Sequence, residues 1–245
     1  MLRHSFCHLK GIGTKTERKL WQSGIRTWEE LAEARKLSLP SAPRTYLRDQ
    51  LEASQQHLAD GDAEYFAKVL PSNEQWRLLW DFGARIAYLD IETTGLGEDS
   101  HITAIAFYDG KQTRTYVHGV NLEQFADDIL GTQLLVTYNG RCFDVPIIER
   151  ELRIKLPRAH IDLRLVLIAL GFKGGLKRCE HALGLMRGDL EGVDGAYASV
   201  LWHEHLRSGN PAALETLLAY NVADVLGLEV LLARACNLKL KDTPM

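Results

Sequence analysis

The chain has little of several features that mark specialised classes of protein. Its 245 residues include only four cysteines, which are scattered and form no CxxC pair, so the sequence disfavours a disulfide scaffold or a zinc module. No charge sign dominates, because 29 Lys and Arg stand against 32 Asp and Glu, a formal net charge of −3. This balance argues against a uniformly basic nucleic-acid coat protein.

Long apolar runs and an apolar leader are missing as well. No uninterrupted apolar run approaches the roughly 18 residues of a membrane span, and no apolar stretch follows the first residues as in a secretory signal. We therefore expect a cytoplasmic protein with reduced thiols and no membrane association. The apolar content of 46% and charged content of 25% are those of a globular chain, long enough for one large domain and a small appendage.

The near-neutral total hides an uneven distribution of charge. Residues 1–45 carry nine Lys and Arg against four Asp and Glu, a net charge of +5, so the rest of the chain carries the negative excess. The first segment is therefore the part of the chain whose charge suits a polyanion.

The sequence divides into three parts: a small helical region at 1–40, a helical connector at 41–83 and an α/β domain at 84–245. In the first part, Gly11 and Gly13 allow a tight turn. Thr14 with Glu17, and Thr27 with Glu30, have the spacing of helix capping boxes. These helices are too short to enclose a core by themselves.

In the third part, short apolar segments alternate with amphipathic ones, which predicts a mixed sheet flanked by helices. The pair Asp109-Gly110 favours a two-residue hairpin turn. Strands are expected at 86–89, 101–108, 113–118, 133–137 and 160–161, and helices at 122–130, 145–152, 163–170, 194–207 and 211–236.

Asp90 and Glu92 are two apart at the end of the first apolar strand. Residues i and i+2 of a strand point to the same face, so the two carboxylates should lie side by side. Such a pair is costly unless a proton or cation separates the charges, and hard divalent ions prefer oxygen ligands. By itself a DxE pair is more typical of a solvated strand end than of a metal site.

Two further acids follow at positions that the chemistry of metal sites would use. Asp144 stands between a buried strand and a helix, where it is either a ligand or a helix cap. Asp224 lies within a long apolar helix, where a buried carboxylate needs a cation, either a metal ion or an arginine. Tyr220 precedes it by four residues and shares its helix face, so Tyr220 is either a core residue or part of a site.

The set Asp90, Glu92, Asp144 and Asp224 resembles the DEDD 3′–5′ exonuclease superfamily, which has a ribonuclease H-like fold. The resemblance covers about residues 84–236, and Tyr220 matches the tyrosine branch of that superfamily. It implies a nuclease that holds two Mg²⁺ or Mn²⁺ ions on the four carboxylates and hydrolyses phosphodiester bonds at the 3′ end of DNA or RNA. In that scheme Tyr220 orients the attacking water.

The resemblance also suggests residues that contact the nucleic acid, with single strands or 3′ ends as the expected partner. In similar enzymes the loop after the DxE pair meets the terminal nucleotide, which assigns Thr93, Thr94 and Leu96 to that role. Asn139 either faces the same terminus or forms a turn with Gly140. Asp162 is expected to cap the following helix.

Two basic segments are candidate phosphate contacts. Lys177 follows a Gly-rich turn at the start of a helix, although such charges are often merely solvated. Residues 9–13 resemble the hairpin of a helix-hairpin-helix module, which implies phosphate contacts from Gly11, Gly13 and Lys15. The alternative is a small helical cap that only packs on the nuclease.

Two other functions are compatible with the same residues. One is a nucleic-acid-binding scaffold with little catalysis, although a scaffold has no need of four clustered carboxylates. The other is a phosphodiesterase or endonuclease that acts on short or structured nucleic acids.

Overall fold

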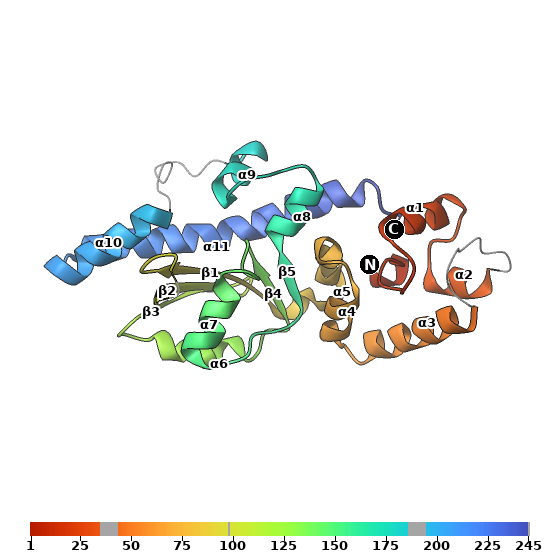
Figure 1. Cartoon of the computed structure of the whole chain (residues 1–245), viewed down its shortest axis with the longest axis horizontal. Coiled ribbons are helices and arrows are strands. Elements are labelled where there is room, and N and C mark those ends of the chain that lie inside the picture. Colours follow the sequence, from red (N-terminus) through yellow and green to blue (C-terminus); the bar gives the residue numbers. More distant parts are fainter. Residues whose placement is uncertain (35–43, 98, 186–194, 245) are drawn as a thin grey trace.

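The computed structural model describes residues 1–34, 44–97, 99–185 and 195–244, and within them helices surround a single five-stranded sheet (Figure 1). The strands are β1 Ile86–Thr93, β2 Ile102–Tyr108, β3 Thr113–Val117, β4 Leu134–Thr137 and β5 His160–Asp162. The α-helices are α1 Thr14–Gln22, α2 Trp28–Glu33, α3 Arg44–Ala59, α4 Ala63–Val69, α5 Leu79–Phe82, α6 Phe125–Ile129, α7 Asp144–Leu152, α8 Leu163–Ala169, α9 Leu176–Ala182, α10 Gly195–Ser208 and α11 Pro211–Leu240. Short 3-10 helices are η1 Leu2–His4, η2 Ser72–Leu78, η3 Gly83–Arg85 and η4 Leu122–Gln124.

The sheet is mixed, as the sequence predicts. Its strand order is β3-β2-β1-β4-β5. β1, β2 and β3 form an antiparallel meander, whereas β4 and β5 run parallel to β1. β1 is thus the central strand and continues to Thr93, further than its apolar residues suggest, because it pairs with β2 as far as Ile102. Asp90 and Glu92 therefore lie within the strand rather than beyond its end.

Alternate residues of β1 pack against different helices. Leu89 and Ile91 lie in a core with Phe125 of α6 and Ile148 of α7. Tyr88 faces the other way and shares a core with the buried side of α11. The alternation of a strand then directs the side chains of Asp90 and Glu92 to the α11 side of the sheet.

The long helix α11 lies across the sheet and contacts β1 and β2 (Figure 1). By length and mean hydropathy this helix is also long and apolar enough to cross a membrane. Polar residues interrupt its sequence, so it contains no long uninterrupted apolar run. Its packing against the sheet accounts for its apolar composition, since Leu217, Leu228 and Leu231 are fully buried.

The N-terminal helices do not have a core of their own. Leu2, Phe6 and Trp28 belong to one continuous cluster of buried residues that reaches Leu231 and Leu232 of α11. Both chain ends lie beside α1 in Figure 1, because the end of α11 extends from the sheet to the N-terminal helices. Residues 1–34 are thus packed onto the rest of the protein.

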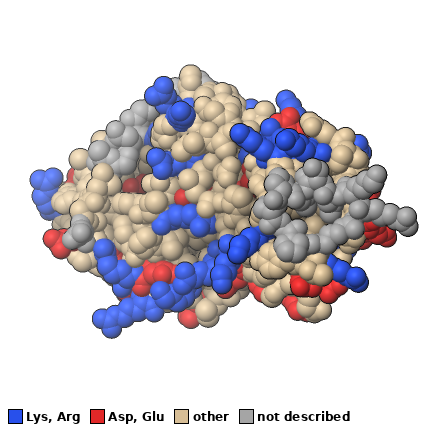
Figure 2. Space-filling view, turned by 45° about the vertical axis from the view of Figure 1, so that its right-hand side comes forward, with Lys and Arg blue, Asp and Glu red and all other residues tan. Residues whose placement is uncertain are grey.

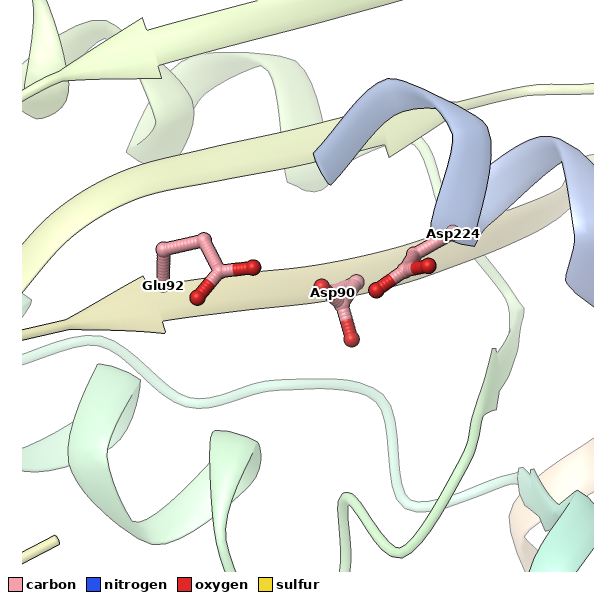
Figure 3. Close-up of side chains that lie close together, drawn as sticks. All are labelled: Asp90, Glu92 and Asp224. Carbon is pink, nitrogen blue, oxygen red and sulfur yellow. The ribbon is translucent and has the colours of Figure 1, made fainter. Parts of the chain in front are cut away.

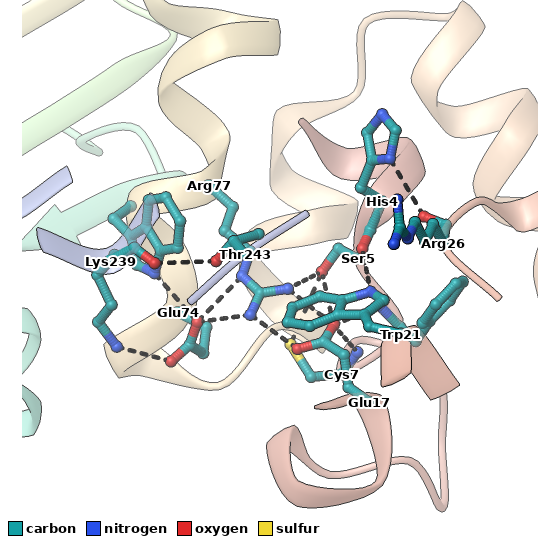
Figure 4. Close-up of polar contacts among 12 residues, drawn as sticks. His4, Ser5, Cys7, Glu17, Trp21, Arg26, Glu74, Arg77, Lys239 and Thr243 are labelled. Atoms are coloured by element: carbon teal, nitrogen blue, oxygen red, sulfur yellow. Dashed lines mark hydrogen bonds and ion pairs between the residues drawn. The ribbon is translucent and has the colours of Figure 1, made fainter. Parts of the chain in front are cut away.

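A buried ionic network joins these two parts (Figure 4). The guanidinium of Arg77 donates to both carboxylate oxygens of Glu17 at 2.8 Å, and also to Glu74. Lys239, near the end of α11, donates to Glu74 at 2.8 Å. The network of Glu17, Arg77, Glu74 and Lys239, called here the Arg77 network, therefore ties α1, η2 and α11 together.

One local expectation is corrected by these contacts. Glu17 does not form a capping box with Thr14, because α1 begins at Thr14 with Gly13 as its N-cap and Glu17 is turned inward to Arg77. The capping box of Thr27 and Glu30 is present as predicted.

The β2–β3 connection also differs from the expected two-residue turn. It comprises residues 109–112, in which the Asp109 carboxylate accepts bonds from the amides of Lys111 and Gln112. Gly110 has a φ of 85°, a backbone angle that glycine adopts without strain.

Candidate active site

Three of the predicted acids meet in space. Carboxylate oxygens of Asp90, Glu92 and Asp224 all lie within 4.8 Å of one another. Figure 3 shows Asp90 and Glu92 on the same face of β1, with Asp224 directed from α11 towards Asp90. The pairing of residues two apart on the strand and the position of α11 over that face together produce the cluster.

Asp144 contacts the same strand from α7, whereas Asp224 does so from α11. Asp144 is the first residue of α7, whose N-cap is Phe143, and its carboxylate accepts a hydrogen bond of 3.2 Å from the Ile91 amide. This bond places the buried Asp144 against the backbone segment between Asp90 and Glu92. The fourth acid therefore joins the site from α7, although it lies outside the three-residue cluster.

The position of Asp90 is set by a residue that sequence analysis missed. The side-chain amide of Asn221 donates to Asp90 at 2.7 Å, and Asn221 is fully buried. Asn221 precedes Asp224 by three residues, so both lie on the same side of α11. That spacing is the signal in the sequence from which Asn221 could have been predicted.

The acids line a cavity of about 710 Å³ on the α11 side of the sheet. Its walls come from β1 and the loop after it, from the segment before α7, from the start of α9, and from α10 and α11. The predicted residues that line it are Asp90, Glu92, Thr93, Leu96, Asn139, Asp144, Lys177, Tyr220 and Asp224. Tyr138, Phe143 and Ser199 also line it and were not predicted.

Four predicted contact residues are not in this cavity. Thr94 accepts a bond from the His101 amide instead and braces the loop after β1. Gly11, Gly13 and Lys15 are exposed at the start of α1, in the N-terminal part of the protein. A nucleic acid would therefore meet them at a second surface.

Tyr220 is a buried residue of the cavity wall, and the ammonium of Lys177 lies 4.2 Å from the centre of its ring. Lys177 comes from the first turn of α9, after the Gly174-Gly175 turn. A cation thus stands beside the acid cluster, close to the phenol. The turn before α9 is what brings the basic group into the cavity.

The segment that carries Asn139 is held by Asp162. The Asp162 carboxylate accepts bonds from the amides of Asn139 and Arg141 at 2.8 and 3.3 Å, and it caps α8 through the Arg164 amide. Asn139 has a φ of 65°, which asparagine tolerates better than most residues. The predicted capping role of Asp162 is confirmed, with the additional role of shaping the cavity wall.

Burial and mutual repulsion make these carboxylates favour a bound proton or cation. Burial, reinforced by Asp224 and Asp144, raises the pKa of Glu92 to about 8, even though Lys177 opposes this shift. Burial also raises the pKa of Asp144 to about 7 and the pKa of Asp90 well above its ordinary range, the latter with contributions from Asp224, Asp144 and Glu92. Without a cation, the cluster is stable only when partly protonated.

This donor set fits divalent ions. Several buried carboxylates with raised pKa values release protons when a metal binds, and oxygen ligands suit Mg²⁺ and Mn²⁺. Carboxylate oxygens of Asp90, Glu92 and Asp224 lie close enough together to share one divalent ion.

The raised pKa values predict how stability depends on pH. In the metal-free protein Glu92 binds its proton more tightly than in the unfolded chain, so its contribution to stability is full below about pH 4 and is lost as pH rises towards 8. We expect Mn²⁺ to raise the melting temperature more at pH 8 than at pH 5.

Thermal denaturation at both pH values, with EDTA or MnCl₂, measures this effect, and Glu92→Gln is the matched variant. The variant should lose less stability than the wild type between pH 5 and pH 8 in EDTA. Equal losses in the two proteins, or an equal Mn²⁺ shift at both pH values, would contradict the assignment.

The sheet order and the acidic cavity define the class of protein. The family model of the RNase H superfamily matches residues 87–236, more than half of the chain, and the chain belongs to this superfamily. The fold predicted by the resemblance is therefore confirmed. Membership and the acid cluster together indicate a nuclease that uses divalent metal ions.

One solved structure supports the same fold. The chain is similar to the family B DNA polymerase from the hyperthermophilic archaeon Pyrobaculum calidifontis, with a TM-score of 0.50 and 20% identity over 64% of this chain. The similar part is 25% of the polymerase chain, so the likeness concerns the fold alone. A comparison with curated proteins found no match.

Proposed function

We propose that this protein is a metal-dependent 3′–5′ exonuclease of the DEDD type, tyrosine branch, acting on DNA or RNA. The observation that carries the proposal is the convergence of Asp90, Glu92 and Asp224 within 4.8 Å, in a cavity that Tyr220 also lines. A binding scaffold has no use for buried carboxylates with raised pKa values, because they cost stability in the absence of metal.

Each acid has a role that follows from its position. Asp90 is central, because it lies between Glu92 and Asp224 and is oriented by Asn221. Glu92 and Asp224 complete the first metal position, and Asp144 serves the second. Bound there, two Mg²⁺ or Mn²⁺ ions would supply activation of a water and stabilisation of the leaving oxygen.

Tyr220 orients the attacking water through its hydroxyl, from the cavity wall that it shares with Asp224. Lys177 beside its ring supplies a positive charge for the scissile phosphate. Both groups lie on the wall that the terminal nucleotide would face.

The mouth of the cavity suits a splayed 3′ end. Leu96 is 89% exposed although apolar, and it lines the cavity together with Thr93. An exposed leucine at that position can separate the last two bases, while Asn139 faces the terminal sugar from the other wall.

The direct test is incubation with Mn²⁺ of 5′-labelled single-stranded DNA, duplex DNA and RNA, each of about 20 nucleotides. We expect a ladder of products that shortens from the 3′ end. No ladder should form in EDTA, or with a labelled strand whose 3′ hydroxyl is blocked. Internal cuts, or binding without products, would contradict the proposal and favour the endonuclease or scaffold function.

A further inference from the structure

Four polar side chains form a stripe along α1, in the N-terminal part of the protein. Lys15, Arg18, Lys19 and Gln22 are all exposed, whereas Glu17, Leu20 and Trp21 of the same helix are buried. At 100° per residue the four exposed positions fall within one third of the helix circumference. We call Lys15, Arg18, Lys19 and Gln22 the α1 basic stripe.

The stripe ends in a second cavity. This cavity has a volume of about 410 Å³ and is lined by Arg18, Trp21, Gln22, Arg26, Asp242 and Pro244. It lies at the C-terminal end of α1, where free carbonyl groups would repel an anion. Here the amides of Ser23, Gly24 and Ile25 already bond those carbonyls, so the two guanidinium groups dominate the charge.

The carboxylate of Asp242 lies beside Arg18 in this cavity, where an anionic ligand would bind. Asp242 is paired with Arg18 at 3.5 Å, and the two side chains are 71% and 62% exposed. Exposed pairs of this kind contribute little to stability and are readily exchanged. Among the described residues, Lys15 and Lys19 have no ion-pair partner.

We infer that the α1 basic stripe and the adjoining Arg18–Arg26 cavity bind successive phosphates of a nucleic-acid strand, and that Asp242 competes with the phosphate for Arg18. From Lys15 to Gln22 the helix rises about 10 Å, so the stripe is long enough to contact more than one phosphate of a strand. In Figure 2, which brings the N-terminal side forward, Lys and Arg side chains lie in several separate groups over the visible face.

This site is separate from the acidic cavity and rests on the proposed function only in the choice of nucleic acid as ligand. It would hold a strand away from the point of cleavage, which favours long substrates over short ones. Its contacts are to phosphate, so binding should depend on salt and not on base sequence.

The test is fluorescence anisotropy of a labelled 30-nucleotide single strand in EDTA, where no cleavage occurs, at 50 to 300 mM NaCl. For Lys15→Ala/Arg18→Ala/Lys19→Ala we expect a Kd increased about tenfold or more at 50 mM, and a salt slope smaller by about 2, since each lost phosphate contact on a single strand removes about 0.7. Asp242→Asn should lower the Kd about two- to fivefold at the same salt concentration.

The control is Arg48→Ala/Lys68→Ala/Lys111→Ala, which removes three exposed charges from α3, α4 and the β2–β3 turn. This variant should retain most of the affinity, and circular dichroism checks that both triple variants are folded. Equal loss of affinity in the two triple variants, or an Asp242→Asn variant that binds no more tightly, would overturn the inference. Release of nucleotides from a trinucleotide with Mn²⁺ tests the acidic cavity alone, so failure of the proposed function would be seen separately.

Discussion

Asp224→Asn is expected to lose roughly 10³-fold in the rate of nucleotide release and, at the same time, to be more stable than the wild type in EDTA. The first effect follows because an amide cannot supply the charge that a divalent ion needs at this position. The second follows because the substitution removes one buried charge from three carboxylates within 4.8 Å. An increase of a few degrees in the melting temperature corresponds to about 1 kcal/mol for a chain of this size.

The opposite signs of the two effects make the test specific. A variant that simply misfolded would lose both activity and stability. Glu215→Gln makes the same chemical change at an exposed position of α11 and should alter neither quantity. Substantial release by Asp224→Asn, or a lower melting temperature in EDTA, would show that Asp224 has another role.

Replacing Arg77 by methionine is expected to lower the free energy of unfolding by about 3–5 kcal/mol, since it leaves the buried carboxylate of Glu17 without its cation, while Glu74 keeps only Lys239. Arg77 is 3% exposed and Glu17 is 1% exposed, so water cannot replace the lost bonds. Glu17 would also keep its bonds from the amides of Phe6 and Cys7, and so would remain buried in the variant. Denaturation by urea, followed by circular dichroism, measures the loss.

Two comparisons isolate the Arg77 network from general effects of the substitution. Arg48→Met removes an exposed arginine that pairs with Glu52 on α3, and should change stability by about 0.5 kcal/mol or less. Glu17→Gln combined with Arg77→Met should cost less than the sum of the two single changes, because the carboxylate and the guanidinium are direct partners. Additive losses would mean that the 2.8 Å pair contributes nothing beyond packing.

The Arg77 network also makes the N-terminal helices part of the same packed structure as α11. The helices of residues 1–40 are predicted to be too short to enclose a core by themselves, and in the structure Leu2, Phe6 and Trp28 share a core with α11 while Glu17 is bonded to Arg77. Deleting this segment would expose apolar surface and a buried arginine. Single surface substitutions on α1 are therefore the sound way to test its binding role.

Local periodicity accounts for the parts of the site that were predictable. Asp90 and Glu92 share a strand face because they are two apart, and Tyr220 and Asp224 share a helix face because they are four apart. Both relations hold in the structure, as both pairs line one cavity. The boundaries of most strands and helices followed from the same periodicities and from turn residues.

Contacts between segments far apart in the sequence could not be predicted from local spacing. Asn221 bonds Asp90 across 131 residues of sequence. Its spacing from Asp224 puts both residues on one side of α11, but only the packing of α11 on β1 brings Asn221 to Asp90. Glu17 had the spacing of a capping residue, but a buried guanidinium offered a stronger partner than an exposed helix end. In both cases a long-range polar contact outweighed the local pattern.

The sequence by itself determined the class of fold, the order of the acids and the tyrosine that accompanies them, because these depend on the period of strands and helices and on residue chemistry. The tertiary structure alone decided that α11 lies over β1, that the carboxylates are buried together with raised pKa values, and that the basic side of α1 faces solvent. Burial and proximity arise from packing between segments far apart in the chain, and local spacing carries no information about that packing.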